Sequence, residues 1–109
     1  MPQYLLQGSY TSDAWAAQVK DPKNRLDAVR PAFEALGGTI DHSWLCFGEF
    51  DLAVVASFPD NVSAAAISIA VAAGGAINLK TTPLPSIEDG VEATKRAGQV
   101  GYRPPGMGF

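Results

Sequence analysis

Two long apolar runs that are separated by only two residues constrain this fold more than any other feature. The runs extend from Thr39 to Phe47 and from Phe50 to Phe58, and both are rich in β-branched and aromatic residues. Gly48 and Glu49 stand between them. Because glycine at the first turn position suits a two-residue type II′ reversal, the stretch predicts a tight β-hairpin.

The register of this hairpin sorts its side chains onto two faces. A turn at Gly48 and Glu49 sets three pairs opposite each other, namely Cys46 and Asp51, Trp44 and Ala53, and His42 and Val55. Alternation along each strand then gives one apolar face, suited to packing under helices: Leu45, Phe47, Phe50, Leu52, Val54, Ala56 and Phe58. The other face mixes polar, small and aromatic residues: Ile40, His42, Trp44, Cys46, Asp51, Ala53, Val55 and Ser57.

The flanking sequence supplies two further strands, from Gln3 to Tyr10 and from Ala76 to Leu84. Helices are predicted between and after the strands. They are a short helix after Ser12 as N-cap, an amphipathic stripe from Leu26 to Leu36 with Pro31 as a kink or restart, a helix from Asp60 to Gly75, and a last one from Ser86 to about Arg96. This order predicts an α+β fold, a ferredoxin-like βαββαβ sandwich with an antiparallel sheet plus a C-terminal helix. Residues 1–97 form the domain, and residues 98–109 form a tail rich in glycine and proline.

A second copy of the chain is the expected partner. The half-polar sheet face still holds Trp44 and Val55, which suits pairing with another sheet better than exposure to water. Residues 61–75 contain no charged side chain, so their helix is expected to be covered by protein, and it is shorter than the ~20 apolar residues that a bilayer requires. We therefore predict a homodimer or higher homo-oligomer.

Charge and cysteine content argue against several other partners. The chain has 8 basic and 11 acidic residues, a net charge of −3, and no cluster of Lys and Arg that would follow a phosphate backbone. The N-terminus has neither a cationic start nor a long apolar segment, and Cys46 is the single cysteine. We expect a cytoplasmic protein that binds no nucleic acid and no membrane.

The hairpin sequence resembles that of the GYD-domain proteins, small bacterial proteins that are named for a Gly, Tyr, Asp signature. Gly48, Phe50 and Asp51 occupy the matching places, and Pro59 and Asp60 follow the second strand. The resemblance extends from Tyr4 to about Leu84. It implies a fold of the dimeric α-β barrel superfamily, in which subunits pair sheet to sheet, and it implies no particular reaction. Phe50 replaces the signature tyrosine, so a role for a phenolic hydroxyl there is absent.

The titratable residues of the hairpin do not match a common catalytic or metal-binding arrangement. Asp51 is interpreted as a carboxylate that accepts hydrogen bonds from turn amides, with a ligand contact or general base as the alternative. Cys46 is interpreted as a packing thiol, because an ionised Asp51 opposite it disfavours the thiolate. His42 is the single histidine and the best acid-base candidate, although the register sets it about four residues from Asp51, roughly 13 Å at ordinary strand rise. No metal site and no cofactor are predicted.

Three functions remain open at this point. The first is a protein that binds a small, mostly apolar molecule near the sheet, with five candidate ligand contacts: Tyr4, Tyr10, Trp44, Phe50 and Asp51. The second is an enzyme like the cofactor-independent oxygenases and isomerases of the same superfamily, with His42 or a tyrosine in proton transfer. The third is an assembly module whose alanine-rich helix packs against neighbouring subunits.

Overall fold

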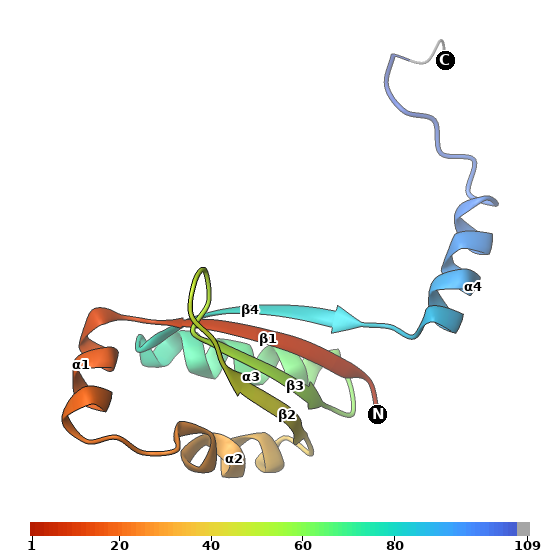
Figure 1. The fold of residues 1–109 in the computed structure, drawn as a ribbon. Coiled ribbons are helices and arrows are strands. Elements are labelled where there is room, and N and C mark those ends of the chain that lie inside the picture. Colours follow the sequence, from red (N-terminus) through yellow and green to blue (C-terminus); the bar gives the residue numbers. More distant parts are fainter. Residues whose placement is uncertain (107–109) are drawn as a thin grey trace.

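The strands form one antiparallel sheet in the order β2-β3-β1-β4 (Figure 1). A computed structural model describes residues 1–106 of the chain, so the end of the predicted tail, residues 107–109, lies outside the described residues. In chain order the elements are β1 (Gln3–Tyr10), α1 (Ser12–Lys20), α2 (Arg25–Ala35), β2 (Thr39–Leu45), β3 (Leu52–Ser57), α3 (Asn61–Gly74), β4 (Ile77–Leu84) and α4 (Ile87–Ala97). This is the predicted ferredoxin-like α+β fold with an additional C-terminal helix.

Polar side chains fix where the helices begin. The Asp60 carboxylate accepts from the Ser63 amide, and the Ser86 hydroxyl accepts from the Asp89 amide, as the sequence predicts. At α1 the prediction is wrong by one residue, because Thr11 rather than Ser12 is the N-cap. Helix α2 continues through Pro31, which neither ends nor restarts it.

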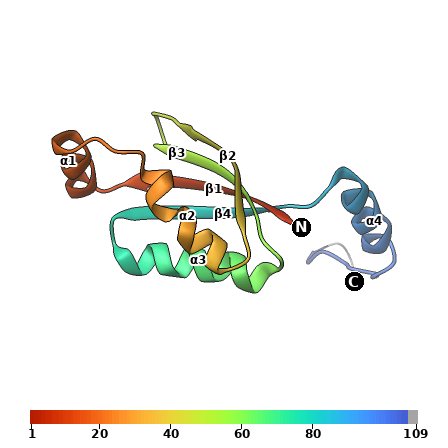
Figure 2. The ribbon, with the colours of Figure 1, turned by 90° about the horizontal axis from the view of Figure 1, so that it is seen from below.

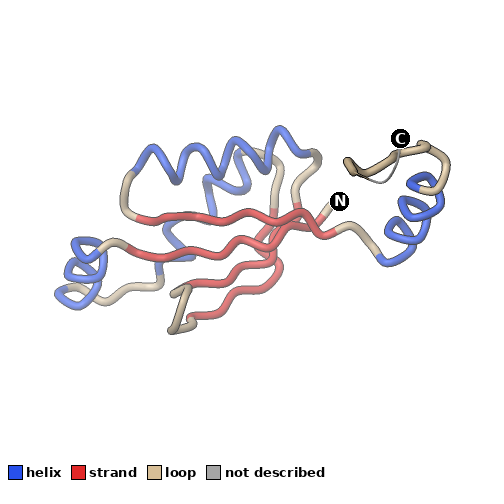
Figure 3. Tube along the Cα trace, turned by 90° about the horizontal axis from the view of Figure 1, so that it is seen from above, coloured by secondary structure: helices blue, strands red, loops and turns tan. Residues whose placement is uncertain are grey.

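The core lies between the sheet and helices α2 and α3, which cover the same side of it (Figures 2 and 3). The central strands β1 and β3 supply half of the buried hydrophobic side chains, Phe58 follows β3, α2 adds Phe33, and α3 adds Ala64 and Ile67. Phe58 is 0% exposed at the centre of this cluster. A Cβ on Gly38 would lie 2.5 Å from the Phe58 ring, so glycine permits the close approach of the chain after α2.

The predicted hairpin register is correct near the turn, with Trp44 opposite Ala53 and His42 opposite Val55. The turn itself is longer than the two-residue reversal that we predict. The strands end at Leu45 and resume at Leu52, and Gly48 has φ of 133°, whereas a type II′ turn requires about +60°. Across the hairpin the Cys46 amide donates to the Asp51 carbonyl at 2.8 Å, which leaves the four residues from Phe47 to Phe50 as the loop, while the Asp51 amide donates to the Gly8 carbonyl of β1.

A β-bulge changes the predicted division of faces at one end of β2. The register shifts between Ile40 and His42, which leaves Asp41 as the extra residue. Ile40 therefore pairs with the buried Ala56 and packs against the core, so its predicted place beside His42 and Trp44 is wrong. His42 and Trp44 project, as predicted, from the side of the sheet that α2 and α3 leave uncovered. Leu45 and Phe47 are 71% and 96% exposed, so the prediction that they pack under the helices is wrong, because β2 ends at Leu45 and Phe47 lies in the loop beyond it.

Two apolar surfaces remain uncovered in a single chain. On α3, Val62 is 77% and Ile69 is 69% exposed, although the helix contains no charge. Helix α4 stands away from the sheet in every view, with Ile87 and Val91 exposed (Figures 1 to 3). The radius of gyration is 17.9 Å, against about 13 Å for a compact domain of this size, because α4 and the following segment extend outward.

Candidate functional site

A small apolar hollow lies between the sheet and helices α2 and α3, and we call it the inner chamber. Its volume is about 110 Å³. The lining side chains are almost all apolar: Leu6, Leu26, Val29, Phe33, Leu52, Val54, Val71, Ala76, Ile77 and Leu79, with Tyr10 and Arg25 as the polar members. Strand β1 ends here and α2 begins here, so the chamber opens at the end of the sheet where α1 departs.

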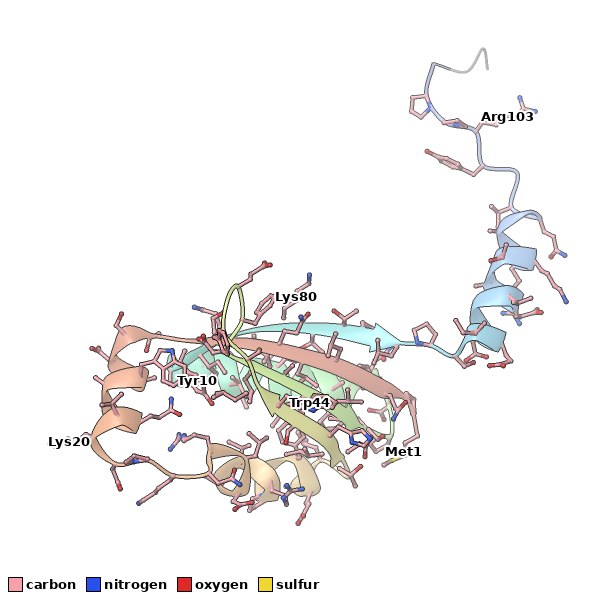
Figure 4. The ribbon with its side chains drawn as sticks, in the orientation of Figure 1. Met1, Tyr10, Lys20, Trp44, Lys80 and Arg103 are labelled. Carbon is pink, nitrogen blue, oxygen red and sulfur yellow. The ribbon has the colours of Figure 1, made fainter. Side chains whose placement is uncertain are left out.

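Tyr10 is the polar residue that the sheet holds against this chamber. It is the last residue of β1 and lies on the helix-covered face, where its ring meets the Trp15 ring edge-on at 5.1 Å (Figure 4). Burial raises the pKa of the phenol above its ordinary 10.0, the nearby Arg25 charge opposes that rise, and Asp51 adds to it. The hydroxyl is therefore protonated at neutral pH, and among residues 1–106 it has no hydrogen-bond partner.

Arg25 shares the rim with Tyr10. It is the first residue of α2, directly after the Asn24 N-cap, and it is exposed. Its guanidinium forms no ion pair within the described part of the chain, where the salt bridges join Lys23 to Asp21 and Arg96 to Glu92. The rim thus offers one unpaired cation and one unpaired phenol above an apolar interior.

Asp51 fixes the position of Tyr10. Its Oδ2 accepts from the Tyr10 amide at 3.0 Å and from Trp15 Nε1 at 3.2 Å. The β1–β3 ladder ends at Gly8 and Leu52, so the carboxylate satisfies an amide that lies beyond the end of that ladder. This is the structural role that we expect for Asp51, except that the donors belong to β1 and α1 rather than to the turn.

His42 and Trp44 lie on the uncovered face of β2 and do not line the chamber, although Trp44 lines a surface cleft together with Tyr10 and Arg25. Their rings stack with centroids 5.8 Å apart, and Trp44 is 55% exposed (Figure 4). The register confirms that His42, opposite Val55, is four residues along the ladder from Asp51, so the two do not pair. Lys80, on β4, occupies the opposite edge of the same sheet. A catalytic role for His42 stays a prediction.

The remaining predicted contacts are separated from one another. Tyr4 is 2% exposed in the core and donates its hydroxyl to the Asn61 side chain. Phe50 is half-buried in the loop before β3 and does not line the chamber. Of the residues that we predict as ligand contacts, the fold brings Tyr10 and Asp51 into contact, whereas Tyr4, Trp44 and Phe50 do not line the chamber.

A larger groove of about 520 Å³ lies where β1 begins and β4 ends, beside the start of α4. Its walls include the first residues of the chain and the segment from Pro83 to Ser86. The one buried polar side chain in it, Tyr4, already donates to Asn61. The groove therefore presents no unpaired buried group to a ligand, and the inner chamber is the better candidate site.

The uncovered face also carries a carboxylate with three donors. Asp41, at the bulge, accepts from Ser57, Thr39 and Gln3. The Ser57 hydroxyl is the largest cause that lowers the pKa of Asp41 below its ordinary 3.8. The ionised carboxylate thereby joins β2 to β3 and β1 where the bulge interrupts the ladder.

We expect the stabilisation by Asp41 to disappear in acid. The pKa of Asp41 is lower in the folded protein than in the unfolded chain, so the ionised carboxylate stabilises the fold at pH values above the unfolded pKa. This stabilisation is lost as the pH falls through the folded pKa. Urea unfolding of the parent protein and of Asp41→Asn should therefore differ at neutral pH, and the difference should shrink as the pH falls below the ordinary Asp41 pKa of 3.8. A difference that stays constant over this range would contradict the assignment.

Other site classes find no support within residues 1–106. No group of three His, Cys, Asp or Glu side chains converges to hold a metal ion there. None of the helices in that part of the chain is long and apolar enough to cross a membrane.

Sequence reasoning missed most of the chamber, including Arg25, Val71 and Leu79. The spacing of Leu26, Val29 and Phe33 marks a core-facing stripe, and the stripe does face the sheet. A pattern of apolar residues does not reveal that two packed layers leave a hollow between them. The signal in the sequence was Arg25, a cation directly after Asn24, which caps the helix that carries this stripe.

Comparison with known proteins identifies the family of this chain. Searches of curated proteins and of solved structures give no match. The family model described as GYD domain matches residues 4–94, which include nearly all of the sheet, the chamber and most of α4. Gly48, with its positive φ, and Asp51, with its two hydrogen bonds, are the residues that carry the resemblance in the loop. The chain belongs to the GYD-domain family.

Proposed function

We propose that this GYD-domain protein binds a small, mostly apolar molecule in the inner chamber, and that it works as a cytoplasmic homodimer. The observation that carries the proposal is the chamber itself, an apolar hollow of about 110 Å³ with the unpaired Tyr10 hydroxyl on its wall. Apolar cavities in proteins accept apolar guests such as benzene or xenon. A few polar groups on an apolar wall are typical of a small-molecule site.

The size of the chamber limits the guest. An apolar cavity of about 150 Å³ accommodates benzene, so a chamber of 110 Å³ encloses an apolar body of roughly four to six carbon atoms. Several lining residues, among them Val29, Val71 and Leu79, pack against the core but are only half-buried. A guest would supply the dispersion contacts that these side chains lack on the chamber side.

The dimer is proposed on the uncovered sheet face. This face holds the exposed Trp44, and its two edges carry opposite charge, with Asp41 on β2 and Lys80 on β4. A two-fold axis that runs along the strands would set the β2 edge of one subunit against the β4 edge of the other. Because Trp44 and Lys80 both align with the Ala53–Gln7 pair, this axis would set the Trp44 ring of each subunit opposite Lys80 of its partner, a cation–π contact that a second copy supplies twice.

Xenon is the sharpest probe of the chamber, because it has no polar group and binds apolar cavities. We expect saturable ¹H–¹⁵N shift changes in the full chain under xenon pressure, centred on the amides of the lining residues. Val71→Phe should fill the chamber and abolish these changes. Ile69→Phe, two residues earlier on α3 and 69% exposed, is the matched control and should keep them.

The chamber proposal has clear failure outcomes. Xenon shifts that are absent, or that survive Val71→Phe, would overturn it. If Val71→Phe unfolds because the site is overpacked, Ala76→Phe fills the chamber from an exposed rim position and gives the same test.

A further inference from the structure

We propose that the molecule held in the inner chamber is a small carboxylate, with its apolar body inside and its charged group at the rim between Arg25 and Tyr10. This inference rests on the proposed function and adds the charge of the ligand to it. The ligand class is a short branched or cyclic carboxylic acid in its ionised form.

Tyr10 and Arg25 mark the boundary between the apolar interior and the surface. Both residues line the inner chamber, and both also line two surface clefts that adjoin it. One cleft, of about 260 Å³, extends towards Ser43 and Trp44, and the other, of about 430 Å³, extends along α1. A ligand with its body in the chamber would therefore meet the phenol and the guanidinium where it reaches water.

Positive charge gathers at this boundary, although the chain as a whole carries −3. Lys20 and Lys23 line the clefts together with Arg25 (Figure 4 labels Lys20 on α1). Lys23 is partly neutralised by Asp21 at 3.1 Å, whereas the guanidinium of Arg25 has no carboxylate partner in residues 1–106. An anion is thus favoured over a neutral or cationic group of equal size.

The other candidates for binding the charged group are already occupied. The Asn24 side chain accepts from the Leu26 and Asp27 amides, so the first turn of α2 has these donors engaged. Asp51 is an anion, and its Oδ2 accepts from the Tyr10 amide and the Trp15 indole, so it does not bind the charged group of the ligand. Recognition of the ligand charge therefore falls to the Arg25 side chain, and the Tyr10 hydroxyl adds one hydrogen bond.

Two probes of the same shape test the charge directly. They are 3-methylbutanoate and 3-methylbutanamide, titrated into the full chain at neutral pH and followed by ¹H–¹⁵N shifts. We expect the carboxylate to bind about tenfold more tightly, the effect of one charge-assisted contact at a partly exposed site. Arg25→Gln should bring the two affinities within about twofold of each other, and Arg25→Lys should keep part of the preference.

Arg30→Gln is the matched control, because Arg30 lies on the same helix but does not line the chamber or the clefts. It should leave the preference for the carboxylate unchanged. Equal affinities of the parent protein for the two probes, or a preference that survives Arg25→Gln, would overturn the inference. If xenon binds but neither probe does, the carboxylate is wrong while the chamber proposal stands.

Discussion

Phe58→Ala will lower the free energy of unfolding by about 3–5 kcal/mol, the range for a large aromatic side chain that is removed from a packed core. Phe58 is 0% exposed, and its ring lies 5.5 Å from the Phe33 ring and 5.9 Å from the Tyr4 ring. It joins β3 to α2 and to β1, so truncation leaves a cavity where three elements meet. Because a domain of this size is stable by only about 5–15 kcal/mol, the variant should be close to unfolding.

Phe47→Ala is the matched control for this prediction. It removes the same side chain at a position that is 96% exposed, and we expect a change within about 0.5 kcal/mol. Urea unfolding of both variants, followed by far-UV circular dichroism, makes the comparison. Similar losses in the two variants would mean that the core is not centred on Phe58.

Trp44→Glu should convert the proposed dimer into a monomer. In an isologous interface each subunit contributes the same residue, so one substitution removes two tryptophans and introduces two carboxylates. A tryptophan hot spot is worth about 2 kcal/mol or more, so the dissociation constant should rise by about a hundredfold or more. Sedimentation at micromolar concentration should give the 11.4 kDa mass for the variant and twice that mass for the parent protein.

The control for the dimer introduces the same charge on the other side of the molecule. Val62, on α3, is 77% exposed and lies on the helix-covered side of the sheet. Val62→Glu should leave the mass of the dimer unchanged. A parent protein that sediments only as a monomer would remove the basis of this proposal. A Val62→Glu variant that dissociates while Trp44→Glu does not would place the contact on α3 instead.

The order of elements and much of the register follow from the sequence alone. Alternation in the two apolar runs correctly pairs Trp44 with Ala53 and His42 with Val55, because a strand has a fixed period of two. The caps at Asp60 and Ser86 are equally local, since each side chain contacts an amide three residues along the chain. Features that depend on neighbouring residues are therefore well predicted.

The misplaced residues depend on distant contacts. Ile40 lies on the opposite face from the prediction because one extra residue, Asp41, is held by donors from β1 and β3. At the end of the loop, Asp51 is held by Gly8, Tyr10 and Trp15, all of which lie outside the hairpin. None of these partners is visible in a local pattern. The inner chamber escapes prediction for the same reason, because it is a property of how two layers fit together.

The link between β4 and α4 has a consequence for any partner that the terminal helix contacts. Pro83 and Pro85 flank Leu84, and each proline ring fixes its own backbone φ angle. Proline also keeps the preceding residue extended, so the link from β4 to α4 has fewer conformations than a flexible linker. A partner would therefore bind a helix whose position relative to the sheet is already restricted. Less conformational freedom would be lost on association than if the helix were joined by a flexible linker.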